Sequence, residues 1–275
     1  MSNCTVIAVV NQKGGVGKTT STYNLGWELG KLGKKVLLVD LDSQANLTMQ
    51  AGVPTPDKLS FTLATLLTKC IYDDEFTYDN EDILIHKEMI DLLPSNIELS
   101  NVEIQIVNVM SRESVLDRIL EKYKDDYDYI IIDCMPSLGM MPINALVAAN
   151  KVIIPVVPEF WAVKGIEALL KTIKNVKKKM NSGLEIEGIL LTKYTPNLRI
   201  TKEMEQIITD VFGERINVFD SKIPAVTKMG DTAINSLSAR EMYESLKIKK
   251  HKESIEKVMT AYKNLSLEIV NKEMK

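Results

Sequence analysis

Residues 5–20 have the sequence Thr-Val-Ile-Ala-Val-Val-Asn-Gln-Lys-Gly-Gly-Val-Gly-Lys-Thr-Thr. The run that leads to Asn11 is apolar and β-branched, which is typical of a parallel strand buried on both faces. A glycine-rich loop follows, and a helical pattern covers residues 19–32, after which Gly33 fits the residue that ends a helix. A second buried strand at 35–40 would complete a βαβ unit with two parallel strands.

The alternation of strand and helix continues along the chain. Further apolar strand candidates lie at 129–133, 151–157 and 186–192. Residues 60–125 have mostly helix and loop patterns, with a short strand candidate at 89–93. No linker, low-complexity tract or fixed-period repeat divides the chain. We therefore predict an α/β fold with a doubly wound, mostly parallel sheet flanked by helices, built as one domain over residues 1–275.

The charge of the chain is unevenly distributed. Its 34 basic and 37 acidic residues sum to −3, which excludes a globally basic nucleic-acid-binding protein. Residues 247–275 contain eight lysines and four glutamates, so this segment carries +4 and the preceding 246 residues carry −7. The C-terminal segment therefore offers either a basic binding surface or a solvated helix face.

The remaining composition excludes several other classes. Three cysteines, Cys4, Cys70 and Cys134, form no CxxC pair and suggest neither a disulfide framework nor a zinc site. No apolar run approaches the roughly 18 residues that span a bilayer, so we expect a cytoplasmic protein without a membrane segment. An apolar stripe at helical spacing within 255–269 either packs on its own domain or forms a membrane-binding amphipathic helix.

The loop between the first strand and helix has the features of a phosphate site. Backbone N–H groups of a glycine-rich turn at a helix start can point at one anion. Lys18 would reach the β- and γ-phosphates, and Thr19 would offer its hydroxyl to Mg²⁺. The standard P-loop pattern does not fit in full, because its first glycine would fall at Gln12. The predicted phosphate cradle consists of Gly14, Gly15, Val16, Gly17, Lys18, Thr19 and Thr20.

Four segments together resemble one known family. Residues 13–20, Lys-Gly-Gly-Val-Gly-Lys-Thr-Thr, are similar to the deviant Walker A motif of the ParA/MinD group of P-loop ATPases. Residues 39–48, Val-Asp-Leu-Asp-Ser-Gln-Ala-Asn-Leu-Thr, resemble its second motif. Residues 129–139, Tyr-Ile-Ile-Ile-Asp-Cys-Met-Pro-Ser-Leu-Gly, resemble its Walker B and switch region, and 144–150 continue the match. The closest pattern is that of the ParA/Soj partition ATPases.

The resemblance implies roles for individual residues. Lys13 matches the signature lysine that reaches the partner's phosphates across a nucleotide-sandwich dimer. Asp42 matches the carboxylate that positions the attacking water, so the catalytic set is Lys13, Lys18 and Asp42. Asp133 matches the Walker B carboxylate that holds Mg²⁺ together with Thr19. Asp40 either holds Mg²⁺ through water or has a structural role.

Two later loops align in order with those that clasp adenine in the family. They are Thr-Lys-Tyr-Thr-Pro at 192–196 and Ile-Pro at 223–224, and we assign Lys193 and Pro224 to nucleotide binding by this resemblance. In the switch region, Met135 stands where the family commonly has proline. Because proline fixes φ and lacks an N–H, Met135 would allow a more flexible loop there.

The resemblance also implies a cycle. ATP and Mg²⁺ would join two copies into a homodimer that binds double-stranded DNA nonspecifically on the nucleoid, and a ParB-like partner would trigger hydrolysis, so that plasmid or chromosome DNA is segregated. The alternatives are a MinD-like membrane-cycling ATPase and a regulator of a mobile element built on the same ATPase. The basic residues that could contact DNA phosphates are Arg199, Lys202, Lys228, Lys247, Lys249 and Lys250.

Overall fold

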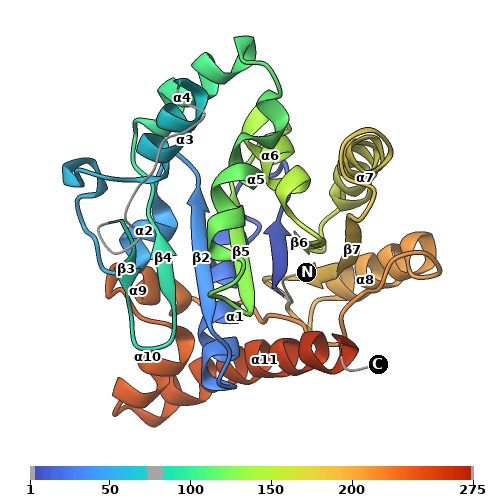
Figure 1. Cartoon of the computed structure of the whole chain (residues 1–275). Helices are drawn as coiled ribbons and strands as arrows, with labels where there is room; N and C mark the ends of the chain where they lie inside the picture. Colours follow the sequence, from blue (N-terminus) through green and yellow to red (C-terminus); the bar gives the residue numbers. More distant parts are fainter. Residues whose placement is uncertain (1–3, 73–82, 274–275) are drawn as a thin grey trace.

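A seven-stranded sheet with helices on both faces forms the centre of the computed structural model (Figure 1), which describes residues 4–72 and 83–273. Lys275, counted above in the C-terminal charge, lies outside the described residues. The sheet has the order β3-β4-β2-β5-β1-β6-β7. The strands are β1 (Thr5–Val9), β2 (Val36–Leu41), β3 (Ile85–His86), β4 (Asp91–Leu93), β5 (Tyr129–Cys134), β6 (Lys151–Val156) and β7 (Glu185–Leu191).

The predicted doubly wound, mostly parallel sheet is confirmed. Every neighbouring pair of strands is parallel except β3 and β4, which are antiparallel. The six strands expected from the sequence are present within one or two residues of their expected bounds, and β3 was not expected. The α-helices of the described part are α1 (Lys18–Lys31), α2 (Asn46–Gln50), α3 (Leu63–Tyr72), α4 (Leu99–Gln105), α5 (Val115–Leu120), α6 (Met140–Ala148), α7 (Ala162–Lys179), α8 (Arg199–Phe212), α9 (Met229–Ile234), α10 (Ala239–Ser245) and α11 (Lys249–Glu273).

Alternate side chains of the central strands build two separate apolar cores. In β1, Val6 and Ala8 pack with residues of α3 and α5 to α8 on one face of the sheet. Ile7 and Val9 point to the other face and pack with residues of α1, α10 and α11. This period of two explains why the strand sequences are apolar throughout, since both faces are covered.

Helix α1 ends as the sequence predicts. Gly33 has a φ of +81°, in the left-handed region that favours glycine. The Gly33 N–H donates to the carbonyl of Gly30 at 2.9 Å, and the Lys34 N–H donates to the carbonyl of Leu29 at 3.2 Å. This pair of bonds is the Schellman arrangement, which satisfies the last carbonyls of the helix and turns the chain into β2.

The C-terminal helix α11 packs on its own domain. Of its apolar stripe, Ile255, Val258, Tyr262, Leu265 and Ile269 are buried in the core on the α1 side. The amphipathic stripe is thereby explained by internal packing, and it is not free to enter a bilayer.

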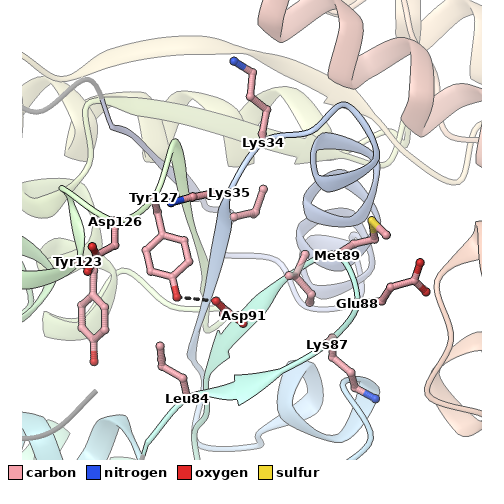
Figure 2. A pocket seen from close by; sticks show the side chains of 12 residues that line it. Lys34, Lys35, Leu84, Lys87, Glu88, Met89, Asp91, Tyr123, Asp126 and Tyr127 are labelled. Carbon is pink, nitrogen blue, oxygen red and sulfur yellow. Dashed lines mark hydrogen bonds between the residues drawn. The ribbon is translucent and has the colours of Figure 1, made fainter. Parts of the chain in front are cut away.

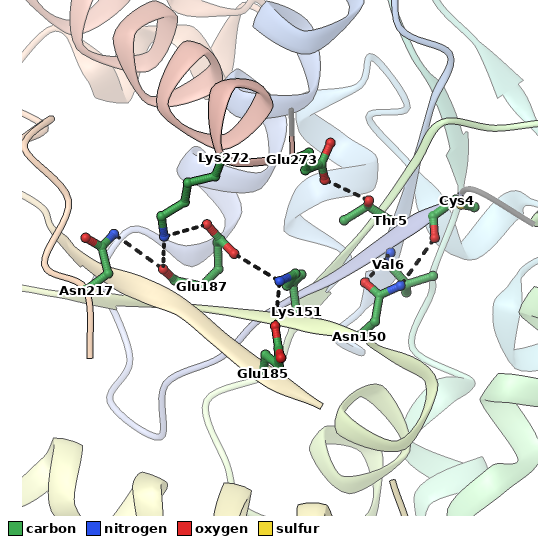
Figure 3. A network of polar contacts seen from close by, with 10 residues as sticks. All are labelled: Cys4, Thr5, Val6, Asn150, Lys151, Glu185, Glu187, Asn217, Lys272 and Glu273. Atoms are coloured by element: carbon green, nitrogen blue, oxygen red, sulfur yellow. Dashed lines mark hydrogen bonds and ion pairs between the residues drawn. The ribbon is translucent and has the colours of Figure 1, made fainter. Parts of the chain in front are cut away.

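Polar contacts fix the end of α11 to the sheet (Figure 3). Lys272 Nζ lies 2.8 Å from Glu187 Oε1 on β7, and Lys151 of β6 lies 3.6 Å from the other carboxylate oxygen. The Glu187 carboxylate is almost fully buried, so the two lysines compensate a charge that would otherwise be costly to bury. Thr5 at the start of β1 donates a hydrogen bond of 2.8 Å to Glu273.

A buried ion pair joins α10 to α1 and yields a first prediction. Arg240 donates from Nε and Nη2 to the two oxygens of Glu28 at 2.8 and 2.7 Å, and only 5% of the Glu28 side chain is exposed. We expect Arg240→Ala to lower the free energy of unfolding by about 3 kcal/mol, because a buried carboxylate loses its partner. Urea denaturation would measure this. Arg199→Ala, which breaks the solvated pair with Glu203, is the control, and equal losses in the two variants would contradict the prediction.

Candidate functional site

The glycine-rich loop after β1 borders a cavity at the carboxyl ends of the strands. Gly15 and Gly17 have φ values of +71° and +83°, so the loop uses two left-handed positions before α1 begins at Lys18. Doubly wound folds hold ligands at this edge of the sheet. The cavity has a volume of about 660 Å³. The predicted site residues that line it are Gly14, Gly15, Gly17, Lys18, Thr19, Thr20, Asp42 and Lys193.

The cavity has a further wall that the sequence analysis missed. Gln44, Asn46, Met49 and Gln50, from the segment that follows β2 and from α2, complete the lining together with Pro136. Their place directly after Asp42, at the carboxyl edge, is the signal that could have found them. Val16, predicted in the cradle, is buried, and its carbonyl accepts a 2.8 Å hydrogen bond from Thr192.

Lys18 is held inside the loop that it follows. It is 7% exposed, and its Nζ donates to the backbone carbonyl of Lys13 at 3.2 Å. Burial lowers the pKa of Lys18, while the nearby carboxyl groups of Asp133 and Asp42 act in the opposite direction. Lys18 thus lines the cavity as a buried residue whose ammonium has one described hydrogen bond and carboxylates nearby.

Two buried carboxylates face one another across neighbouring strands. Asp40 of β2 and Asp133 of β5 are register partners, and they are 0% and 1% exposed. Asp40 accepts hydrogen bonds from the N–H and hydroxyl of Thr48, at 2.8 and 2.7 Å, and from the N–H of Asp42 at 3.3 Å. Burial raises the pKa of Asp40 to about 7. Both Asp40 carboxylate oxygens thus accept hydrogen bonds from α2 or from the segment before it. These contacts favour the structural alternative for Asp40 over the Mg²⁺ role.

Asp133 differs from Asp40, because its Oδ1 is buried with no hydrogen-bond partner among the described residues. Burial raises its pKa well above the usual range, as does the nearby Asp40 charge, while a hydrogen bond from Thr19 and the charge of Lys18 lower it. No group of three or more His, Cys, Asp or Glu side chains within 4–72 and 83–273 could hold a metal ion. Mg²⁺ usually takes one or two carboxylates plus substrate phosphates, and an orphaned carboxylate oxygen beside Thr19 fits that requirement.

Lys13 and Asp42 lie at the rim. The Asp42 carboxylate accepts from the N–H of Gln44 at 2.9 Å, which holds the turn that begins the α2 wall. The Lys13 ammonium does not line the cavity and instead contacts Glu159, in the loop after β6. About half of each side chain in this pair is exposed, so the ion pair is solvated and weak.

The two predicted adenine loops lie side by side. The N–H of Tyr194 bonds to the carbonyl of Ile223 at 2.9 Å, and that of Ala225 bonds back to Tyr194 at 3.0 Å. Lys193 and Pro224 line a second cavity of about 330 Å³, which shares Gly17, Thr20 and Lys193 with the first. Tyr262 of α11 also lines it, and its hydroxyl lies 3.2 Å from Ser21 Oγ. From the sequence, Tyr262 is expected only as a member of the apolar stripe within 255–269, which either packs on its own domain or binds a membrane.

The candidate DNA contacts do not gather in one patch. Arg199 and Lys202 lie on α8, whereas Lys247, Lys249 and Lys250 lie at the α10–α11 junction on the opposite side of the molecule (Figure 1). All five are exposed, and Arg199 is paired with Glu203. Lys228, just before α9, is half-buried and paired with Asp231 at 2.7 Å. One copy of the chain therefore presents its exposed basic side chains at two separate places, on α8 and at the α10–α11 junction.

A further cavity, of about 510 Å³, lies at the amino ends of β2 and β4, and none of the predicted site residues lines it. Figure 2 shows Tyr127 pointing at Asp91, to which its hydroxyl donates at 2.6 Å. Burial, followed by this hydrogen bond, raises the pKa of Tyr127. Both signs of charge line the cavity, with Lys34, Lys35 and Lys87 on one hand and Glu88, Asp91 and Asp126 on the other. Separately, none of the described helices is long and apolar enough to cross a membrane.

Known proteins resemble this chain over most of its length. The model of the AAA domain family matches residues 4–186. The sporulation initiation inhibitor protein Soj of Bacillus subtilis is 40% identical over 231 residues, which cover 82% of this chain and 86% of that protein. Chromosome partitioning protein ParA of Caulobacter vibrioides is 33% identical and covers 82% of each chain. The crystal structure of cobyrinic acid a,c-diamide synthase from Mycobacterium smegmatis, with bound ATP analog and magnesium, is 33% identical, has a TM-score of 0.74 and covers 88% of this chain and 96% of the synthase.

Proposed function

The chain belongs to the ParA/Soj-like family of P-loop ATPases, and from this premise we propose that it is a Mg²⁺-dependent partition ATPase that acts as an ATP-bound homodimer on DNA. The observation that carries the proposal is that buried Lys18 and partly buried Thr19 and Asp42 line one glycine-rich cavity. The buried Asp133 is close enough to Thr19 to accept its hydrogen bond. The Soj and ParA relatives are 40% and 33% identical to this chain, and the synthase is 33% identical. We therefore base the proposal on the partition proteins.

In this proposal, ATP lies with its phosphates on the loop of residues 14–20 and its base between Lys193 and Pro224. Loop N–H groups and the Lys18 ammonium bind the phosphate oxygens, in a cavity where burial strengthens each contact. Thr19 and Asp133 would hold Mg²⁺, whose charge offsets the charge that develops on the β- and γ-phosphate oxygens. Asp42 orients the attacking water at the rim.

Lys13 completes the site from the partner copy. Its solvated pair with Glu159 is weak, so the ammonium can exchange that carboxylate for the phosphates of a second protomer at little cost. A second cation there stabilises charge in the transition state. Hydrolysis would then remove the contact that joins the two copies.

DNA binding follows from dimerisation in this cycle. In a dimer, the basic side chains of α8 and of the α10–α11 junction from two copies would contact one duplex. Lysines suit contacts to phosphates that do not depend on the base sequence. A ParB-like partner would trigger hydrolysis and release from the nucleoid into the cytoplasm. The burial of the apolar stripe of α11 argues against the MinD-like alternative.

The testing experiment measures binding to random-sequence duplex DNA and to anionic liposomes, with ATP and with ADP. We expect salt-sensitive binding to DNA with ATP, weak binding with ADP, and no binding to liposomes. In Asp42→Ala, ATP hydrolysis should fall by at least about 100-fold, because the attacking water loses the carboxylate that orients it, while ATP-dependent DNA binding persists.

Asp210→Ala is the matched control, since Asp210 is exposed on α8 and contacts only Gln206 among the hydrogen bonds described. It should hydrolyse ATP as the wild type does. Liposome binding without ATP-dependent DNA binding would reject the partition cycle in favour of membrane cycling. Full ATPase activity in Asp42→Ala would remove Asp42 from the catalytic set.

A further inference from the structure

The amide of Gln50 is an unsatisfied group at the wall of the nucleotide cavity. Gln50 is the last residue of α2, is 2% exposed and lines the cavity that contains Lys18 and Thr20. Its Nε2 is buried and has no hydrogen-bond partner among the described residues. Buried amide donors are nearly always paired in native proteins, so this exception calls for a physical reason.

The position of Gln50 is fixed by its neighbours. Two residues earlier, Thr48 donates to Asp40 and accepts from the N–H of Ser95 at 2.9 Å, so the middle of α2 is bonded to both β2 and the segment after β4. Ser236 donates to the carbonyl of Met49 at 3.2 Å. The unsatisfied amide is therefore carried by a short helix that is held from three directions, which is how a binding group is preorganised.

An apolar side chain would be the more stable choice at this position. An unpaired buried donor costs free energy, whereas an apolar replacement of the same length costs little or stabilises. Residues that break a local stability rule in this way are concentrated at functional sites. The Nε2 group can only donate, so the ligand that satisfies it must present a hydrogen-bond acceptor, and the oxygens of phosphate and ribose are acceptors.

We propose that Gln50 binds the nucleotide, by donating a hydrogen bond from Nε2 to an oxygen of its phosphate and ribose portion. This assignment rests on the proposed ATPase function, because it needs a nucleotide in the cavity shared by Gly15, Thr20 and Gln50. The α2 wall and the glycine-rich loop, which line the same cavity, would then both contact the nucleotide. A neutral amide adds this contact without adding charge beside Lys18.

The test compares Gln50→Met, which keeps the length of the side chain and removes the donor, with Gln50→Glu, which replaces it with a carboxylate. ADP affinity in Mg²⁺ would be measured by calorimetry and the nucleotide-free melting temperature by circular dichroism. Gln50→Met should weaken ADP binding about tenfold, the usual effect of one hydrogen bond to a charged ligand, without a lower melting temperature. Gln50→Glu should weaken it further, because its charge repels phosphate.

Gln206→Met is the matched control, since Gln206 is exposed on α8 and does not line the cavity, and it should bind ADP as the wild type does. Normal ADP affinity in Gln50→Met, or a lower nucleotide-free melting temperature in both Gln50 variants, would overturn the proposal and leave the amide a structural role. If the wild type binds neither ADP nor ATP, the ATPase function fails as well, which distinguishes the two failures.

Discussion

Lys13→Gln is expected to lower the rate of ATP hydrolysis by at least about 100-fold, the effect of removing a cation that stabilises transferred phosphoryl charge. The affinity for ADP should stay near that of the wild type, because the Lys13 ammonium points to Glu159 and does not line the cavity of its own protomer. Steady-state phosphate release and ADP calorimetry would measure the two quantities separately.

The control for this variant is Lys34→Gln, an equivalent exchange at the cavity on the other end of the sheet (Figure 2). It should hydrolyse ATP normally. If Lys13→Gln also does so, Lys13 is a surface lysine and the assignment of the signature lysine is wrong. If Lys13→Gln loses ADP binding in proportion to its rate, Lys13 acts within its own protomer.

Lys18→Ala is expected to weaken ADP and ATP binding by about 100-fold, since a buried ammonium forms charge-assisted contacts to phosphate oxygens. The chain should remain folded, because the only hydrogen bond described for the Lys18 ammonium is to the carbonyl of Lys13. Calorimetry with each nucleotide would give the affinities, and circular dichroism would report folding.

Lys31→Ala, at the other end of α1, tests whether loss of any lysine from this helix has the same effect. Lys31 is partly exposed and pairs only with Glu88 at 3.5 Å among the contacts described. The affinity of the Lys31→Ala variant for ADP should equal that of the wild type. Tight nucleotide binding by folded Lys18→Ala would remove the phosphate role from Lys18.

Much of the fold could be predicted because the central strands carry their own signature. Residues of β1, β2 and β5 are largely apolar on both faces, and Gly33 has the left-handed backbone expected of the residue that ends a helix. Strand β3 was not predicted because two residues, Ile85 and His86, are too few to show a period.

The site was only partly predictable, for a different reason. The sequence motifs locate Lys18 and Asp133, since Lys18 begins the helix after β1 and Asp133 lies near the end of β5. It does not show that both oxygens of Asp40 are occupied by Asp42 and Thr48, or that Gln50 has an unpaired amide, because these depend on the path of α2 back toward the loop. Tertiary contacts of this kind leave no periodic pattern in a sequence.

The two borders of the sheet have a consequence for how copies of the chain can meet. Beyond β7, the N–H of Ile189 bonds to Asn217 at 2.8 Å and the N–H of Phe219 bonds back at 3.0 Å, so that border is already paired. At the other border, β3 offers only two residues. Within residues 4–72 and 83–273, neither border is a long open template for adding strands from another molecule. Self-association by strand pairing, which is hard to reverse, is thus disfavoured, and this leaves the loops at the nucleotide face for the reversible contact of the proposed ATP-bound homodimer.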